Sequence, residues 1–256
     1  MNLFYREFGT GQPVIIIHGL LGMSDIWIPV AKKIAEKYKV IVPDLRNHGN
    51  SPHSSVFNLN ELTNDIIELY HKMGFTSAIL MGHSLGGRIA ISAALKCPDL
   101  FDKIIILDIA PRQYSGNKSI TNLIHVMNRI DLSSKRSMSE IDDLLACFIT
   151  DLRVRQLLLK NIFKSSQGEY MWKVNLKIIT EKIETLMAPV FENTEYLKPA
   201  LFLKGGLSDF IEPDDYRLIY KYFPAAEIEV IPKAGHWLHA DEPDLVLDKV
   251  QSFINS

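Results

Sequence analysis

The segment around Ser84 carries the residues with the clearest chemical potential. It reads GHSLGG at residues 82–87, with a short apolar run before it at 78–81 and an Ala-rich run at 85–96 behind it. A G-x-S-x-G sequence between a strand and a helix is typical of a sharp turn that strains the serine backbone and exposes its hydroxyl above a sheet. The helix N-terminus there favours the negative charge that develops during acyl transfer. We therefore expect Ser84 to be a nucleophile.

A serine hydroxyl needs a base to remove its proton. Among the eight histidines, His236 stands on the loop after the last expected strand, at residues 227–231, from which it can reach across to the nucleophile. His236 is therefore the candidate base. His18 and His83 stand beside motif glycines and are expected to order loops by hydrogen bonds.

The base in turn needs a carboxylate that fixes its tautomer and stabilises the imidazolium. Two aspartates follow expected strands and keep the chain order Ser, Asp, His: Asp108 closes residues 103–107, and Asp209 follows residues 200–204. Topology makes Asp209 the default, because the loop after that later strand usually carries the acid. Both aspartates remain candidates on this reasoning, and either can instead be a turn residue.

An oxyanion needs two backbone donors beside the nucleophile. The glycine-containing loop HGLLG at residues 18–22 follows the first strong strand, so it can direct the Leu20 N–H at the substrate oxygen. The Leu85 N–H, directly after Ser84, is the expected second donor. Donors of this kind contribute roughly 3–4 kcal/mol each to transition-state stabilisation.

Short apolar runs alternate with longer amphipathic runs, which predicts an α/β fold with a mostly parallel central sheet flanked by helices. The alternation stops between residues 111 and 189, where the pattern is helical throughout with no convincing strand. We therefore expect a core of residues 1–110 and 190–256, with a helical cap of residues 111–189 inserted before the late strands. The expected strands are residues 14–18, 40–43, 78–81, 103–107, 200–204 and 227–231, and the helices expected in the cap are 137–149, 152–163 and 174–187.

The expected cap supplies candidate substrate contacts. Its apolar residues are candidates for lining an acyl pocket, although packing within the cap explains most of them. Its basic residues are better explained as a solvated helix face than as a site for an anionic substrate tail. The apolar residues are Phe148, Phe163, Met171 and Trp172, and the basic ones are Lys160, Lys164 and Lys173.

Composition excludes several classes of function. The 256 residues carry a formal net charge of −2, which provides no basic field for nucleic acid. No apolar run is long enough for membrane insertion, and no leader sequence is evident, so a cytoplasmic location is expected. Cys97 and Cys147 indicate buried thiols rather than a disulfide framework. No cluster has metal-ligand spacing, and the expected chemistry needs no cofactor.

These segments together resemble the α/β-hydrolase superfamily over nearly the whole chain. The resemblance is more specific to YbfF-type bacterial esterases and their mitochondrial abhydrolase-domain relatives, as seen in HGLLG (18–22), DLRNHGNS (44–51), GHSLGG (82–87), LDIAP (107–111) and AGHWLHADEP (234–243). Similarity extends into the insertion, in RQLLLKN (155–161) and WKVNL (172–176).

The resemblance implies an α/β-hydrolase fold and a serine esterase that hydrolyses acyl esters, or acyl thioesters, through a Ser-His-Asp triad and an acyl-enzyme. It also favours Asp108 as the acid, because some members use the aspartate of the D-I-A-P segment; this chain departs from them by offering Asp209 as well. Since fold does not fix substrate, C–C bond or lactone hydrolysis is an alternative. A small-molecule receptor with little turnover is a third hypothesis. The sequence does not predict the oligomeric state.

Overall fold

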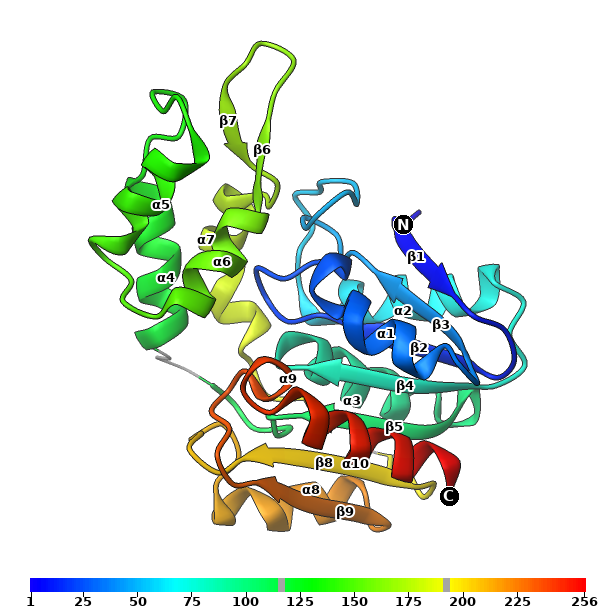
Figure 1. Cartoon of the computed structure of the whole chain (residues 1–256). Helices are drawn as coiled ribbons and strands as arrows, with labels where there is room; N and C mark the ends of the chain where they lie inside the picture. The colour runs from blue at the N-terminus through cyan, green and yellow to red at the C-terminus, as the bar shows by residue number, and fades with distance from the viewer. Residues whose placement is uncertain (115–117, 191–193) are drawn as a thin grey trace.

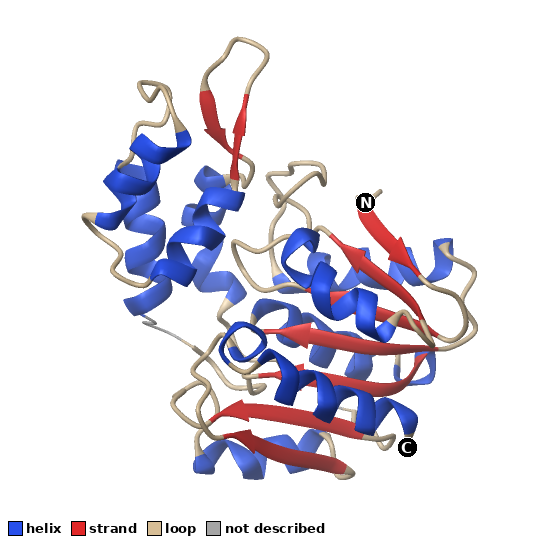
Figure 2. Cartoon of the chain, in the orientation of Figure 1, coloured by secondary structure: helices blue, strands red, loops and turns tan. Residues whose placement is uncertain are grey.

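The buried apolar runs form a central sheet (Figures 1 and 2). The computed structural model describes residues 1–114, 118–190 and 194–256; residues 115–117 of the expected cap and 191–193 of the expected core lie outside the described residues. Among the described residues, seven strands form this sheet in the order β1-β3-β2-β4-β5-β8-β9. They are β1 (Tyr5–Phe8), β2 (Pro13–Ile17), β3 (Lys39–Pro43), β4 (Ala78–His83), β5 (Phe101–Leu107), β8 (Ala200–Gly205) and β9 (Ala226–Ile231).

The expectation of a mostly parallel sheet flanked by helices is confirmed. Among the described strand pairs of this sheet, only β1 runs antiparallel to its neighbour, β3. β1 was not among the expected strands, because an edge strand with the sequence YREF is only half-buried and lacks a continuous apolar run. The six parallel strands bring their carboxyl ends to one edge of the sheet, where open α/β sheets bind ligands.

Alternate side chains of each strand pack into two separate core layers. Ile15 and Ile17 of β2 belong to the layer with α2, α3 and α8, whereas Val14 and Ile16 belong to the layer with α1 and α10. Helices therefore cover both faces, and this accounts for strands that are apolar at every position. The flanking helices are α1 (Ile28–Ile34), α2 (Leu59–Lys72), α3 (Leu85–Lys96), α8 (Tyr216–Tyr222), α9 (Leu238–Asp241) and α10 (Pro243–Asn255), with 3₁₀ turns η1 (Ser24–Trp27), η2 (Pro98–Leu100) and η3 (Pro213–Asp215).

The chain between β5 and β8, called the insertion below, stands above the carboxyl edge of the sheet (Figure 1). Its elements are α4 (Lys118–Arg129), α5 (Met138–Ala146), α6 (Leu152–Lys160), β6 (Ile162–Lys164), β7 (Tyr170–Trp172) and α7 (Leu176–Leu186). The expectation of an all-helical segment was wrong at β6 and β7, which form an antiparallel hairpin. α6 ends at Lys160 rather than continuing to residue 163. Asn161 caps it, and its side-chain Nδ2 donates both to the Leu157 carbonyl of the helix (3.2 Å) and to the Leu21 carbonyl of the core.

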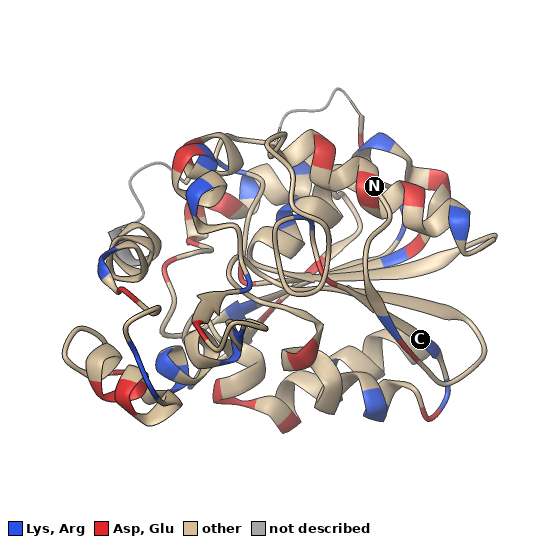
Figure 3. Cartoon of the chain, turned by 90° about the horizontal axis from the view of Figure 1, so that it is seen from above, with Lys and Arg blue, Asp and Glu red and all other residues tan. Residues whose placement is uncertain are grey.

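The surface carries both signs of charge. Seen from above, acidic and basic residues are interspersed over the helices (Figure 3). In the described part of the chain, no helix has the length and apolar character needed to cross a membrane.

Candidate active site

Ser84 lies at a strained turn between β4 and α3. Its backbone has φ 54° and ψ −116°, a left-handed conformation that a non-glycine residue adopts only when its surroundings impose it. Its N–H donates to the Leu107 carbonyl (3.0 Å), which holds the turn against β5. A Cβ at Gly86 would lie 2.3 Å from the Ile17 carbonyl oxygen, and one at Gly82 would lie 2.2 Å from that of Gly86. Both glycines are therefore required for the close approach that presents Ser84.

His236 connects Ser84 to a carboxylate. Its Nε2 is 3.0 Å from Ser84 Oγ, and its Nδ1 is 2.8 Å from Asp108 Oδ2. A hydrogen on Nδ1 donates to the carboxylate, which leaves the Nε2 lone pair to accept the serine proton. The structure thus brings together three residues that lie 24 and 128 positions apart in the sequence.

Asp108 is held in place by more than the histidine. It is fully buried at the end of β5, with φ 50°. Its Oδ1 accepts the Gly205 N–H (2.9 Å), and its Oδ2 also accepts the Ser208 hydroxyl. These donors come from the last residue of β8 and from the loop after it, so this end of β8 supports the carboxylate at the end of β5. Sequence reasoning missed the role of Ser208; its only signal was its place in the loop beside Asp209.

Asp209 does not contact His236. Its side chain is exposed at the rim, and its backbone carbonyl accepts a hydrogen bond from Arg112 Nη2 (3.1 Å). The topological default for the acid is therefore wrong in this structure: after β8 it is Ser208 that turns inward to Asp108. Of the two aspartates, only Asp108 lies within hydrogen-bond distance of the histidine.

A ring stack and a hydrogen bond hold the His236 ring and its loop in place. The Phe210 ring stacks on the imidazole with centroids 3.6 Å apart and planes at 15°. On the other side, His83 Nε2–H donates to the His236 carbonyl (2.7 Å). Burial lowers the pKa of His83 well below 6.5, so its imidazole stays neutral. The expectation that His83 orders a loop is consistent with this contact, and the loop concerned is the one that carries His236.

The expected oxyanion donors lie on either side of Ser84. Leu85 is the first residue of α3, so its N–H has no partner earlier in the helix. Leu20 lies in the turn that the Gly22 N–H closes on the Gly19 carbonyl (3.0 Å). The Leu20 N–H donates to no acceptor among the described residues. A Cβ at Gly19 would be 3.3 Å from Ser84 Cβ, which places this loop directly against the nucleophile.

Two neutral histidines hold the Leu20 loop. The Leu45 N–H donates to His18 Nε2 (3.0 Å), and the Leu21 N–H donates to His48 Nε2 (3.2 Å). Burial lowers the pKa of His18 and lowers that of His48 to about 3. Neutral rings can accept these N–H groups whereas imidazolium rings cannot, so burial maintains the loop conformation. The role of His48 was not anticipated from the sequence.

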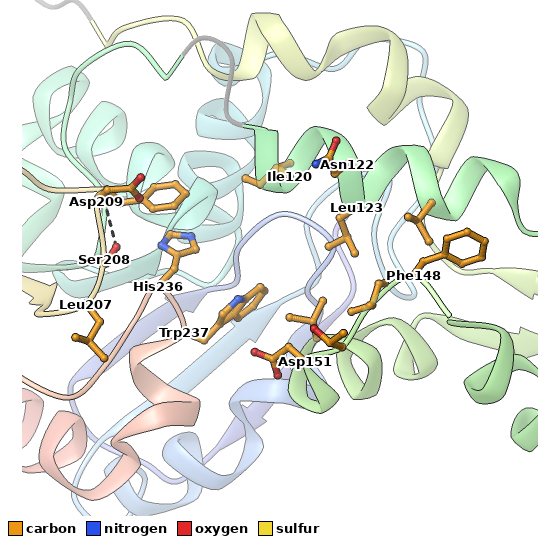
Figure 4. Close-up of a pocket in the computed structure, with 15 residues that line it drawn as sticks. Ile120, Asn122, Leu123, Phe148, Asp151, Leu207, Ser208, Asp209, His236 and Trp237 are labelled. Carbon is orange, nitrogen blue, oxygen red and sulfur yellow. Dashed lines mark hydrogen bonds between the residues drawn. The ribbon is translucent and has the colours of Figure 1, made fainter. Parts of the chain in front are cut away.

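A cavity of about 450 Å³ opens beside His236, between the insertion and the core (Figure 4). Its wall is mainly apolar, with contributions from α4, the chain between α5 and α6, and the loops that follow β8 and β9. Phe148 lines it, whereas Phe163, Met171 and Trp172 lie on the β6–β7 hairpin and do not take the candidate role in an acyl pocket. The favoured expectation of packing fits Trp172, which packs against the core, but not Phe163 and Met171, which are exposed. The lining residues are Ile120, Asn122, Leu123, Val126, Phe148, Ile149, Thr150, Asp151, Val154, Leu207, Ser208, Asp209, Phe210, His236 and Trp237.

Comparison with known proteins gives matches along the whole chain. A family model described as alpha/beta hydrolase fold matches residues 12–133. The chain is 35% identical to the sn-1-specific diacylglycerol lipase ABHD11 of Danio rerio, over 99% of this chain and 82% of that protein. It is 27% identical to Esterase YbfF of Escherichia coli, over 96% of this chain and 94% of the relative. A solved structure described as a marine microorganism esterase superimposes with a TM-score of 0.96 at 38% identity, covering 98% of both chains.

Proposed function

The chain belongs to the α/β-hydrolase family and is a serine hydrolase of carboxylic esters, and from this premise we propose that Ser84, His236 and Asp108 form its catalytic triad. The observation that carries the proposal is the continuous hydrogen-bonded chain from the hydroxyl through the imidazole to the buried carboxylate, at 3.0 and 2.8 Å. This arrangement of nucleophile, base and acid is the one that acyl transfer through an activated serine requires.

The first half of the reaction acylates the enzyme. His236 Nε2 takes the Ser84 proton as Oγ attacks the ester carbonyl carbon, and Asp108 stabilises the resulting imidazolium. The N–H groups of Leu20 and Leu85 hold the oxyanion of the tetrahedral intermediate. When the intermediate collapses, the C–O bond to the alcohol breaks and His236 gives its proton to the departing oxygen.

The second half frees the acid product. A water molecule gives a proton to His236 and attacks the acyl-enzyme carbonyl, with the same two N–H groups holding the oxyanion. Collapse of this intermediate breaks the bond to Ser84 Oγ, which takes the proton back. All proton transfers thus pass through one imidazole, and no group outside the triad has to titrate.

The substrate class follows from the cavity. Its wall is mainly apolar, with leucine, isoleucine, valine, phenylalanine and tryptophan side chains, so it suits the hydrocarbon part of an acyl ester. We propose uncharged acyl esters as substrates, with acyl thioesters as the alternative that a substrate series separates. The name of the Danio rerio relative, a diacylglycerol lipase, supports the ester class. In this proposal the insertion acts as a cap, because α4 and the chain between α5 and α6 close one side of the cavity.

The compartment is a further part of the proposal. Cys97 and Cys147 are both free thiols, which fits a reducing environment such as the cytoplasm.

A labelling experiment tests the nucleophile. The wild-type chain and a Ser84→Ala variant are treated with a fluorophosphonate probe, and hydrolysis of p-nitrophenyl esters and acyl thioesters of increasing chain length is measured beside it. We expect labelling to vanish in Ser84→Ala and kcat to fall by roughly 10³-fold or more. Ser92→Ala is the matched control, because Ser92 is also buried and lies on the same helix. Labelling that persists in Ser84→Ala would remove this serine from its proposed role.

A further inference from the structure

The β6–β7 hairpin carries an apolar pair that the core does not use. Phe163 and Met171 lie directly opposite each other in the antiparallel register. Their exposed fractions are 40% and 48%, whereas Ile162, Tyr170 and Trp172 on the same strands are more buried. The hairpin projects from the insertion on the side away from the sheet (Figure 1). Because successive residues of a strand point to opposite faces, this pair occupies the outer face alone.

The inner face of the hairpin anchors it to the insertion. Ile162 is buried, and its cross-strand partner Trp172 packs against the main hydrophobic core. Tyr170 packs against the same core and places its ring beneath the Lys164 ammonium, 5.3 Å from the ring centroid. The inner face therefore fixes the hairpin, and the outer pair is held in solvent with no packing role of its own.

The segment that carries this pair is rich in lysine. Residues 160–177 contain Lys160, Lys164, Lys173 and Lys177 but a single acidic residue, Glu169. In the described ranges of the chain, none of these four lysines forms an ion pair. The whole chain has a net charge of −2, so positive charge is concentrated at the hairpin while the remainder is acidic. An anionic surface would attract this end of the molecule and repel the rest, which favours one orientation of approach.

We propose that the hairpin is a peripheral docking surface for an anionic lipid bilayer. Phe163 and Met171 enter the boundary between headgroups and acyl chains, and the exposed lysines of the segment, Lys160, Lys164 and Lys177, contact the anionic phosphates. This is contact with a membrane surface and involves no membrane-spanning segment.

A lipid surface fits these features better than a protein or nucleic acid. Two side chains on a narrow projecting hairpin bury far less than the roughly 1,200 Å² of a stable protein interface. Nucleic acid would use the lysines but would leave the apolar pair in water. A bilayer supplies anionic headgroups and hydrocarbon at adjacent depths, which matches exposed lysines and an exposed apolar pair on one short segment.

The hairpin also continues directly from α6, one of whose residues, Val154, lines the cavity beside His236. Docking would therefore hold the cavity at a fixed position relative to the bilayer. This consequence rests on the proposed function, whereas the docking itself does not depend on catalysis.

Vesicle flotation tests the proposal. Full-length protein is mixed with vesicles of phosphatidylcholine alone or with phosphatidylglycerol added. We expect binding only to the anionic vesicles. Lys160→Gln/Lys164→Gln, which removes two exposed lysines of the segment, should weaken it by roughly 25-fold, about fivefold for each lysine near the surface. Phe163→Ser/Met171→Ser should weaken it by roughly tenfold or more through the lost apolar contact.

Matched controls remove equivalent groups elsewhere. Leu197→Ser/Val230→Ser deletes apolar side chains that are 70% and 46% exposed, just before β8 and on β9, and Lys32→Gln/Lys37→Gln removes two exposed lysines outside the insertion. Both should bind as the wild type does. Hairpin variants should also keep wild-type hydrolysis of a soluble short-chain ester, so that a failure of docking is separable from a failure of catalysis.

Three outcomes would overturn the proposal. These are no binding of the wild type to anionic vesicles at low salt, equal losses in hairpin and control variants, and a concentration-dependent dimer in sedimentation that the Phe163→Ser/Met171→Ser change abolishes while vesicle binding remains. The last would assign the outer pair to a second copy of the chain.

Discussion

Replacing Asp108 with Asn probes the most constrained group of the candidate site. The substitution keeps the shape of the side chain and exchanges one carboxylate oxygen for an NH2. In the wild type one oxygen accepts the Gly205 N–H (2.9 Å), and the other accepts both His236 Nδ1–H (2.8 Å) and the Ser208 hydroxyl. Every partner is thus a donor, so an added donor conflicts with at least one of them.

The structure determines which way the amide would point. With its oxygen toward Gly205, its NH2 faces His236 and Ser208, and the serine oxygen can accept from it. The opposite orientation places NH2 against the fixed Gly205 N–H and leaves a buried donor unsatisfied, at a cost of about 1–3 kcal/mol. The favoured orientation therefore forces the hydrogen of His236 onto Nε2, where it faces Ser84 and cannot accept the serine proton.

The expected loss combines two effects. Preference for the wrong orientation lowers the competent population by roughly 5- to 150-fold, since each 1.36 kcal/mol is a factor of ten. The missing negative charge beside the imidazolium lowers the rate further, and the equivalent change in a serine protease triad costs about 10⁴ in kcat. We expect kcat of Asp108→Asn to fall by about 10³- to 10⁴-fold, with a much smaller change in KM.

Steady-state hydrolysis of a soluble ester measures this loss, and thermal unfolding checks that the variant is folded. Asp209→Asn is the control, because its side chain is exposed at the rim, and it should stay within about twofold of the wild type. A loss in Asp209→Asn as large as that in Asp108→Asn, or a loss below tenfold in Asp108→Asn, would refute the reasoning.

Three further predictions concern the surroundings of the triad. His83→Ala removes the donor to the His236 carbonyl, and kcat should fall roughly tenfold at a nearly unchanged KM, with His83→Gln recovering part of the loss because it keeps an N–H donor. Arg46→Met leaves the buried carboxylate of Asp65 without its guanidinium (Nε to Oδ2, 2.6 Å); urea unfolding should show a loss of about 3–5 kcal/mol, and a smaller loss in Arg46→Met/Asp65→Leu. Burial lowers the pKa of His48 from 6.5 to about 3, so between these values the unfolded chain binds more protons and stability falls with falling pH. The unfolding free energy should be about 2 kcal/mol lower at pH 5 than at pH 7.5 from this group alone, and His48→Gln should remove that part of the pH dependence.

Much of the fold was predictable because its strands are buried on both faces. A strand such as β2, with apolar residues at every position, is recognisable without knowledge of its neighbours. Ser84 was predictable for a related reason, since the flanking glycines report a local steric requirement that the sequence itself displays. His236 followed from its place after the last strand.

Sequence spacing does not predict which aspartate contacts His236, because tertiary contacts determine it. β5 and β8 are adjacent parallel strands, so both Asp108 and Asp209 lie near the same edge of the sheet. The left-handed backbone of Asp108 and the inward turn of Ser208 decide between them. The β6–β7 hairpin was not predicted for a similar reason. The contact of the Asn161 side chain with the Leu21 carbonyl accompanies the end of α6, and the apolar pattern of the sequence does not indicate it.

Burial also explains why one histidine among several near Ser84 suits the role of base. Desolvation lowers the pKa of His83, and it lowers those of His48 and His239 to about 3 and about 4, so protonating any of these rings near neutral pH is unfavourable. Among the described residues, none of the three has a carboxylate within hydrogen-bond distance. A base must carry the serine proton for part of each cycle, and an imidazolium in such a place needs a negative partner. His236 alone combines a contact with Ser84 and a contact with Asp108, so the fold separates the histidines that shape the loops from the one that can accept a proton.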